Sequence, residues 1–80
     1  VGNSAGRNSQ GIESVAIGNL AGYTGQARNS IILNASGNQL NNSTIGTFTV
    51  KPVREVTSVT GLKQLYYDET SGEIVYYTPT

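Results

Sequence analysis

The chain has 80 residues, of which 36% are hydrophobic, and its five basic and five acidic residues give a formal net charge of zero. The sequence contains no cysteine and no histidine, which excludes disulfides, Ser-His-Asp and Cys-His catalysis and the commonest zinc ligands. Neutral charge argues against nucleic-acid binding, and no apolar run is long enough for membrane insertion. The low apolar content leaves a single chain with a small core, which predicts that oligomerisation adds the stability that one chain lacks.

A repeat of 16 residues occupies the first half of the chain. Segments 10–17 and 26–33 align at this spacing, and segments 1–6 and 17–22 align in the same way. Each unit combines a short β-branched stretch with a turn rich in glycine, asparagine and serine. This pattern is typical of a β-solenoid or β-roll, in which each coil stacks on its neighbour. We therefore predict that residues 1–45 form a β-roll segment.

The apolar triplets of the repeat predict which side chains point into the coil. Neighbouring side chains in a strand face opposite sides, so the outer two members of each triplet are expected to share one face. We expect this face to be the inward one, with Ala16 and Ile32 pointing outward, where a small Ala16 would let a second chain approach closely. The predicted structural core consists of Val15, Ile17, Ile31, Leu33, Phe48 and Val50.

The composition changes at Gly46, where threonine, valine and tyrosine replace asparagine and glycine. A strand is predicted over 47–51, and it ends at Pro52 because proline has no N–H for the sheet. Residues 53–56 are predicted to form a second short strand. The change divides the chain into the repeat segment and a C-terminal cap, residues 46–80.

Two tyrosine-rich segments, 65–67 and 74–77, flank a polar loop that contains Gly72, and this arrangement predicts a β-hairpin. Adjacent tyrosines in a strand face opposite sides, so one of each pair is expected to point outward. Outward tyrosines would offer a surface for a glycan or receptor, whereas the simpler interpretation is that they stabilise cross-strand pairs. The four tyrosines of the hairpin are Tyr66, Tyr67, Tyr76 and Tyr77.

The acidic residues do not predict a catalytic or metal site. Asp68, Glu69 and Glu73 gather on the hairpin loop without the spacing of a calcium loop or of a glycosidase pair, and the chain has no phosphate-binding glycine loop. No catalytic residue, metal ligand or cofactor is therefore expected, and the chain is interpreted as a non-enzyme. An enzyme that degrades cell-wall polysaccharide would need carboxylates of neighbouring chains, such as Glu55 and Glu69, to meet across an interface.

Segments 14–22 and 29–37 resemble the head repeats of trimeric autotransporter adhesins. The motif Ser-Val-Ala-Ile-Gly at 14–18 carries the resemblance, which covers about residues 1–40. It implies a left-handed parallel β-roll wound from three identical chains. The 16-residue spacing is longer than in those adhesins and implies a wider or differently turned coil.

Segment 46–54, followed by 65–68 and 72–76, is similar to the distal stretch of fibre proteins from large DNA viruses and phages. In that group the stretch often precedes an intramolecular chaperone of the endosialidase type, which assembles the trimer and then cuts itself off. The similarity implies that the chain is the mature fibre tip after this release. None of the chaperone's catalytic residues is present, so the similarity implies no protease role.

Together these observations predict an all-β chain whose homotrimeric β-roll coils are followed by a trimeric cap that contains a β-hairpin. The expected function is that of a structural fibre or spike segment that supports attachment to a host, on the surface of a virion or, alternatively, of a bacterial cell. A fibre tip that binds a host glycan or receptor is the alternative, with the tyrosines and loop 38–44 as candidate surfaces.

Overall fold

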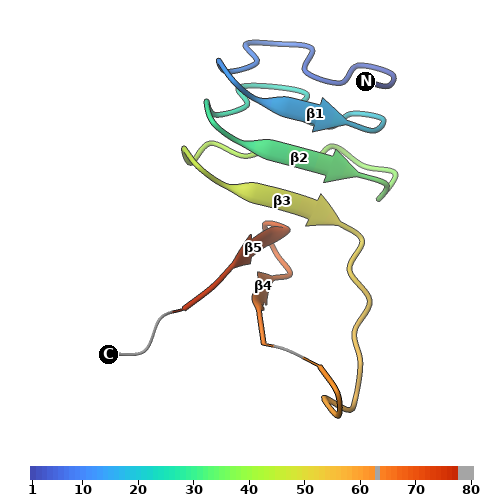
Figure 1. Cartoon of the computed structure of the whole chain (residues 1–80). Helices are drawn as coiled ribbons and strands as arrows, with labels where there is room; N and C mark the ends of the chain where they lie inside the picture. Colours follow the sequence, from blue (N-terminus) through green and yellow to red (C-terminus); the bar gives the residue numbers. More distant parts are fainter. Residues whose placement is uncertain (63, 78–80) are drawn as a thin grey trace.

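The computed structural model describes residues 1–62 and 64–77, and it is all-β, as predicted, with no helix in those ranges. The described residues therefore include no helix of the length and apolarity needed to cross a membrane. One sheet contains every strand, in the order β1-β2-β3-β5-β4 (Figure 1). The strands are β1 (Val15–Ile17), β2 (Ile31–Asn34), β3 (Phe48–Lys51), β4 (Tyr66–Asp68) and β5 (Glu73–Val75).

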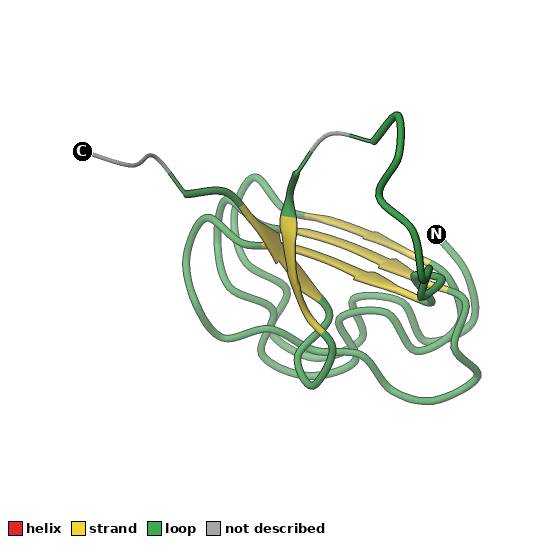
Figure 2. Ribbon diagram, turned by 90° about the horizontal axis from the view of Figure 1, so that it is seen from below, coloured by secondary structure: helices red, strands yellow, loops and turns green. Residues whose placement is uncertain are grey.

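The first three strands are parallel, and the chain makes one full circuit between each strand and the next (Figure 1). Val15 pairs with Ile31, which is the 16-residue spacing seen in the sequence, whereas Ile31 pairs with Phe48, one residue further on. On the opposite wall of the circuits, a parallel bridge joins Ala21 to Leu40. The chain thus forms stacked coils, each with a strand on one side and loops on the other (Figure 2).

The interior of the coils is narrow and contains few apolar side chains. Ala16 and Ile32 point inward from β1 and β2, with exposed fractions of 5% and 0%, and meet Ala21 and Leu40 from the loop wall. A Cβ atom placed on Gly22 of this wall would lie only 3.4 Å from the Ala16 Cβ. Such a thin interior accommodates Ala16 from β1, Ile32 from β2 and Thr49 from β3.

The prediction that the outer two residues of each apolar triplet point into the coil is therefore wrong. Val15, Ile17 and Ile31 lie on the outer face of the sheet and are 44%, 44% and 42% exposed, while their middle neighbours are buried. The side chains do alternate between the two faces of each strand, but alternation alone does not decide which set points inward. The narrow coil takes in the set with the smaller side chains. The remaining members of the predicted core, Leu33, Phe48 and Val50, are half-buried on the same outer face.

The predicted hairpin is confirmed. Strands β4 and β5 are antiparallel, and β5 also pairs antiparallel with β3, so the hairpin covers the edge that β3 would otherwise leave open. The Val50 N–H donates to the Gly72 carbonyl at 2.7 Å, and the Tyr67 hydroxyl donates to the Val50 carbonyl at 2.7 Å. The strand predicted over 53–56 is wrong, because those residues have no sheet partner.

Candidate functional site

The outer face of β1, β2 and β3 carries a continuous apolar surface, which we call the outer stripe. In-register parallel pairing arranges its six side chains in two columns of three. The second column borders a shallow groove of about 380 Å³ that also includes Pro52. A contiguous apolar surface of this kind is a candidate interaction site. The columns are Val15, Ile31 and Phe48, and Ile17, Leu33 and Val50.

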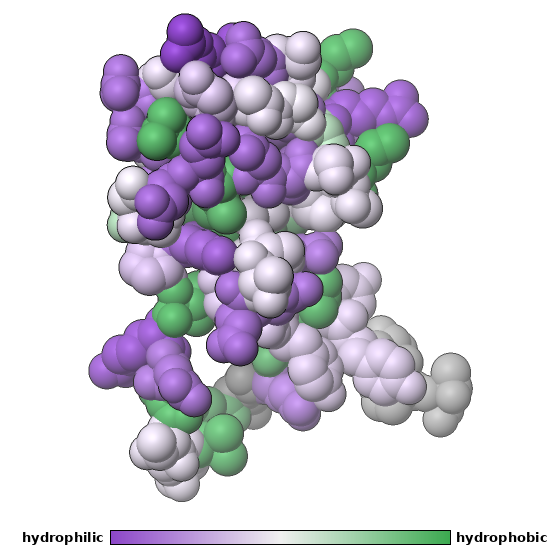
Figure 3. Space-filling model, turned by 180° about the vertical axis from the view of Figure 1, so that it is seen from behind, coloured by the Kyte–Doolittle hydropathy of each residue, from purple (hydrophilic) through white to green (hydrophobic). Residues whose placement is uncertain are grey.

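The opposite side of the coils has a different character. It is formed by the loops that close each circuit and is largely hydrophilic (Figure 3). The coil segment therefore has one face suited to water and one face with apolar side chains that are 42–44% exposed at Val15, Ile17 and Ile31. This asymmetry is typical of a chain that packs through one face only.

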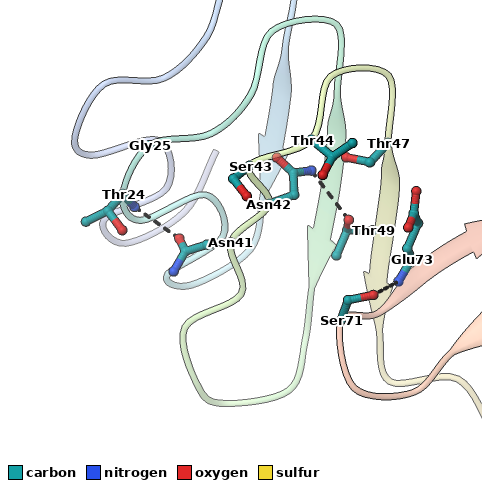
Figure 4. A pocket seen from close by; sticks show the side chains of 10 residues that line it. All are labelled: Thr24, Gly25, Asn41, Asn42, Ser43, Thr44, Thr47, Thr49, Ser71 and Glu73. Atoms are coloured by element: carbon teal, nitrogen blue, oxygen red, sulfur yellow. Dashed lines mark hydrogen bonds between the residues drawn. The ribbon is translucent and has the colours of Figure 1, made fainter.

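A polar pocket of about 260 Å³ lies between the last coil and the hairpin (Figure 4). Two successive loop turns contribute to one side of it, and β3 and the hairpin contribute to the other. Its side chains are hydroxyls, amides and a single carboxylate, so it can donate hydrogen bonds as well as accept them. The lining residues are Thr24, Gly25, Asn41, Asn42, Ser43, Thr44, Thr47, Thr49, Ser71 and Glu73.

A ladder of buried polar side chains leads from the coils to this pocket. The Gln26 amide donates to the Val15 carbonyl at 2.9 Å, and the Ser30 hydroxyl lies 2.6 Å from the Ala27 carbonyl and 3.2 Å from the Asn42 Oδ1. Ser14 makes the corresponding hydroxyl contact one coil earlier, to the carbonyl three residues before it. Hydroxyl residues just before the strands thus stabilise the turn that enters each of the first two strands.

The third coil breaks this pattern at Thr47. This residue precedes β3 as Ser30 precedes β2, and it is only 6% exposed, but its Oγ1 has no hydrogen-bond partner among the described residues. The difference arises from turn length, since Ala21 lies ten residues before Ile31 and its bridge partner Leu40 only eight before Phe48. A buried hydroxyl without a partner costs about 1–3 kcal/mol, so Thr47 is a locally unfavourable residue of the third coil.

The four hairpin tyrosines do not line the pocket. Tyr76 and Tyr77 follow β5 and are 80% and 68% exposed, and Tyr66 is 44% exposed with its hydroxyl 2.9 Å from the Gln64 amide. Tyr67 is half-buried, and its hydroxyl is engaged by β3. Tyr66, Tyr76 and Tyr77 thus remain available as a surface, and their role in binding stays a prediction.

The acidic residues of the hairpin have separate surroundings. The backbone N–H groups of Ser71 and Thr70 donate to the Asp68 Oδ1 at 3.1 and 2.9 Å, which lowers the pKa of this carboxyl below its usual value. Asp68 therefore stabilises the turn, whereas Glu73 borders the pocket. Glu55 and Glu69 are exposed. In the part of the chain that the structure describes, no group of three or more acidic residues is placed to hold a metal ion.

Part of the pocket falls on loop 38–44, which was predicted as a candidate surface and which contributes Asn41, Asn42, Ser43 and Thr44. The contribution of Thr47 was not predicted, although the repeat aligns Ser14 with Ser30. The same alignment, extended by one residue, brings Thr47 to the position before β3 and would have marked the last coil as polar inside. Comparison with protein-family models, with curated proteins and with solved structures gives no match for this chain.

Proposed function

We propose that this chain is a structural segment of a homotrimeric fibre or spike, in which β-roll coils are followed by a trimeric cap. The observation that carries the proposal is the outer stripe, a continuous apolar surface opposite a hydrophilic wall. Three chains that turn their stripes toward a common axis would bury these side chains and leave the loop walls in water. The number three follows from the resemblance of segments 14–22 and 29–37 to trimeric adhesin heads.

The energetic reason for association lies in the small interior of one chain. Ala16, Ala21, Ile32 and Leu40 are its buried apolar core among the described residues, which is little for a domain of this size. Complete burial of a stripe residue such as Ile31, now 42% exposed, would contribute roughly 1 kcal/mol. Six such residues in each of three chains supply a core that the single chain lacks.

The biological role of such an assembly is mechanical. Stacked coils with a shared core form a stiff rod that projects from a surface, and the hairpin ends the parallel stack at β3. We place this rod on a virion surface, where it supports attachment to a host, with a bacterial cell surface as the alternative location. No catalysis is part of this role.

Sedimentation tests the proposal with two variants of equal charge. Ile31→Asp places a carboxylate in the outer stripe, and Asn38→Asp places one on an exposed loop. We expect the unaltered protein and Asn38→Asp to sediment as trimers and Ile31→Asp as a monomer. A monomeric unaltered protein, or a trimeric Ile31→Asp, would contradict the role of the stripe.

A second candidate function, binding of a glycan at the polar pocket, is favoured by the hydroxyl and amide side chains that line it. Sugar hydroxyls both donate and accept hydrogen bonds, and the amides, hydroxyls and the Glu73 carboxylate of the pocket match them. A glycan array followed by titration tests this. Glu73→Ala should abolish binding at the pocket, whereas loss on Tyr76→Ser instead would assign binding to the tyrosine surface.

A further inference from the structure

Residues 52–65, which we call the arm, leave the sheet after β3 and return to it at β4 (Figure 1). The described residues of the arm have no regular secondary structure. The arm folds back on itself in a turn, where the Leu62 N–H donates to the Val59 carbonyl at 3.0 Å and Gly61 has φ 77°. Loops of this length without strands or helices are uncommon in small domains and usually have a function.

Apolar side chains recur in the arm at every third position. All five are exposed, with values between 46% and 79%, although the intervening residues are mainly polar. A spacing of three matches the turn of an extended chain and places such residues on one side of it. A regular apolar series that no described residue of its own chain covers points to a partner outside the chain. The series is Val53, Val56, Val59, Leu62 and Leu65.

The two limbs of the arm enclose a hollow of about 550 Å³. Val56, Val59, Leu62 and Leu65 line it, together with Gln64. Packed proteins fill apolar space of this size with side chains. The hollow therefore has the chemistry of a receptor for apolar side chains that come from elsewhere.

The surroundings of the arm favour a second copy of this chain as the partner. Pro52, its first residue, borders the same groove as Leu33 and Val50 of the outer stripe, so the arm continues that surface. The arm also projects on the strand side of the coils, away from the loop wall (Figure 2). Copies that meet through their stripes bring their arms together as well.

The charges of the arm are compatible with contact between copies. Its charged residues are the adjacent Arg54 and Glu55, which are both exposed, and Lys63, which lies outside the described residues. In a ring of identical chains, the arginine of one copy can face the glutamate of the next at every interface. Identical copies can therefore meet without repulsion between like charges.

We propose that the arm is a clasp that locks copies of this chain together, its apolar series packing against the arms of neighbouring copies below the stripes. This inference rests on the homotrimeric fibre proposed above. It adds a second contact, which is separate from the stripe and can fail independently of it.

Single cysteines provide the test, because the natural sequence contains none. Val59→Cys places a thiol in the apolar series, Thr57→Cys places one beside it as the control, and Ile31→Cys reports on the stripe. After mild oxidation with diamide, we expect a covalent dimer on a non-reducing gel for Val59→Cys, at a yield at least several-fold above that of Thr57→Cys. Dilution before oxidation distinguishes contacts within an assembly from random collisions.

Each outcome decides one of the two proposals. Cross-linking of Ile31→Cys without cross-linking of Val59→Cys above the control overturns the clasp and leaves the fibre standing. The reverse result supports the clasp and contradicts packing through the stripe. An unaltered protein that sediments as a monomer overturns both.

A substitution provides a readout without oxidation. Val59→Asp places a charge in the apolar series, and Thr57→Asp places the same charge at the neighbouring exposed position. We expect the first to weaken association of the chains by about tenfold or more, and the second to leave it unchanged. Equal association for the two variants in sedimentation equilibrium would overturn the clasp.

Discussion

Gly18 shows how one residue permits the coils to stack. It has φ 114°, and a Cβ atom at this position would overlap the carbonyl oxygen of Asn34 in the next coil. Asn34 itself is 7% exposed, and its amide donates to the carbonyls of Asn19 and Asn38 at 2.8 and 2.7 Å. A glycine and a buried asparagine in successive coils thus let two backbones approach closely.

Replacement of Gly18 by alanine should therefore destabilise the fold more than the same change elsewhere. We expect a loss of more than about 2 kcal/mol in the free energy of unfolding, since both the dihedral angle and the contact oppose a side chain. Gly25, with φ 60° and open space around it, is the control, and Gly25→Ala should cost about 1 kcal/mol. Denaturant unfolding followed by circular dichroism compares them, and equal losses would show that stacking does not limit the fold.

Asp68 makes the stability of the hairpin turn depend on pH. Its pKa is lowered in the folded state by the N–H groups of Ser71 and Thr70, so the unfolded chain binds the proton more readily. The stabilisation is present above the unfolded pKa of about 4 and is lost as the pH falls through the folded pKa. Asp68→Asn should reduce the drop in stability between pH 7 and pH 3, and Glu69→Gln should not. An unchanged drop in Asp68→Asn would contradict this role.

At the scale of elements, the repeat spacing predicted which strands pair, but it did not predict which of their side chains point into the coil. The 16-residue offset of the two triplets became the register of β1 and β2. The face was missed because alternation is the same in either direction, and the choice depends on the width of the coil, which is set by the loop wall. Loop 38–44 was predicted as a candidate surface, but the pocket beside it was not, because the pocket depends on a turn that is shorter in the third coil.

The strand predicted over 53–56 is absent for a different reason, because another strand occupies the sheet edge that it would need. The valines there favour a strand, but the open edge of β3 is taken by β5, which arrives from more than twenty residues along the chain. Without a partner, a β-prone segment after Pro52 remains irregular. The hairpin was predictable because its two strands are neighbours in sequence and provide each other with an edge.

The attachment of the hairpin to β3 can be weakened by the removal of one atom. Tyr67→Phe deletes the hydroxyl that donates to the Val50 carbonyl and should lower stability by about 1 kcal/mol. Tyr66→Phe deletes a hydroxyl that contacts only an exposed amide, and it should change stability by less than about 0.5 kcal/mol. Hydrogen exchange at the Val50 amide, which donates to Gly72, provides a local readout. Equal exchange in both variants would show that Tyr67 does not secure the hairpin.

At the scale of the whole molecule, the dimensions explain why association is expected. The chain measures 40 × 30 × 17 Å, so its thinnest direction has room for little more than one sheet and one loop wall. A body this thin keeps most side chains close to its surface, and both the outer stripe and the arm lie on the strand side (Figure 2). If one chain is only weakly stable and the assembly is more stable, the measured stability rises with protein concentration.

Thermal unfolding should therefore respond to concentration. If folding is coupled to the assembly of three chains, the melting temperature should rise by several degrees for each hundredfold increase in protein, and the assembled form should resist heat and detergent. Ile31→Asp should abolish this dependence and melt at a lower temperature, because its stripe can no longer be buried. Scanning calorimetry at two concentrations measures the shift. The unaltered protein could instead melt at a temperature that is independent of its concentration. That result would mean that the narrow coil is stable alone and that a second copy does not explain the apolar stripe.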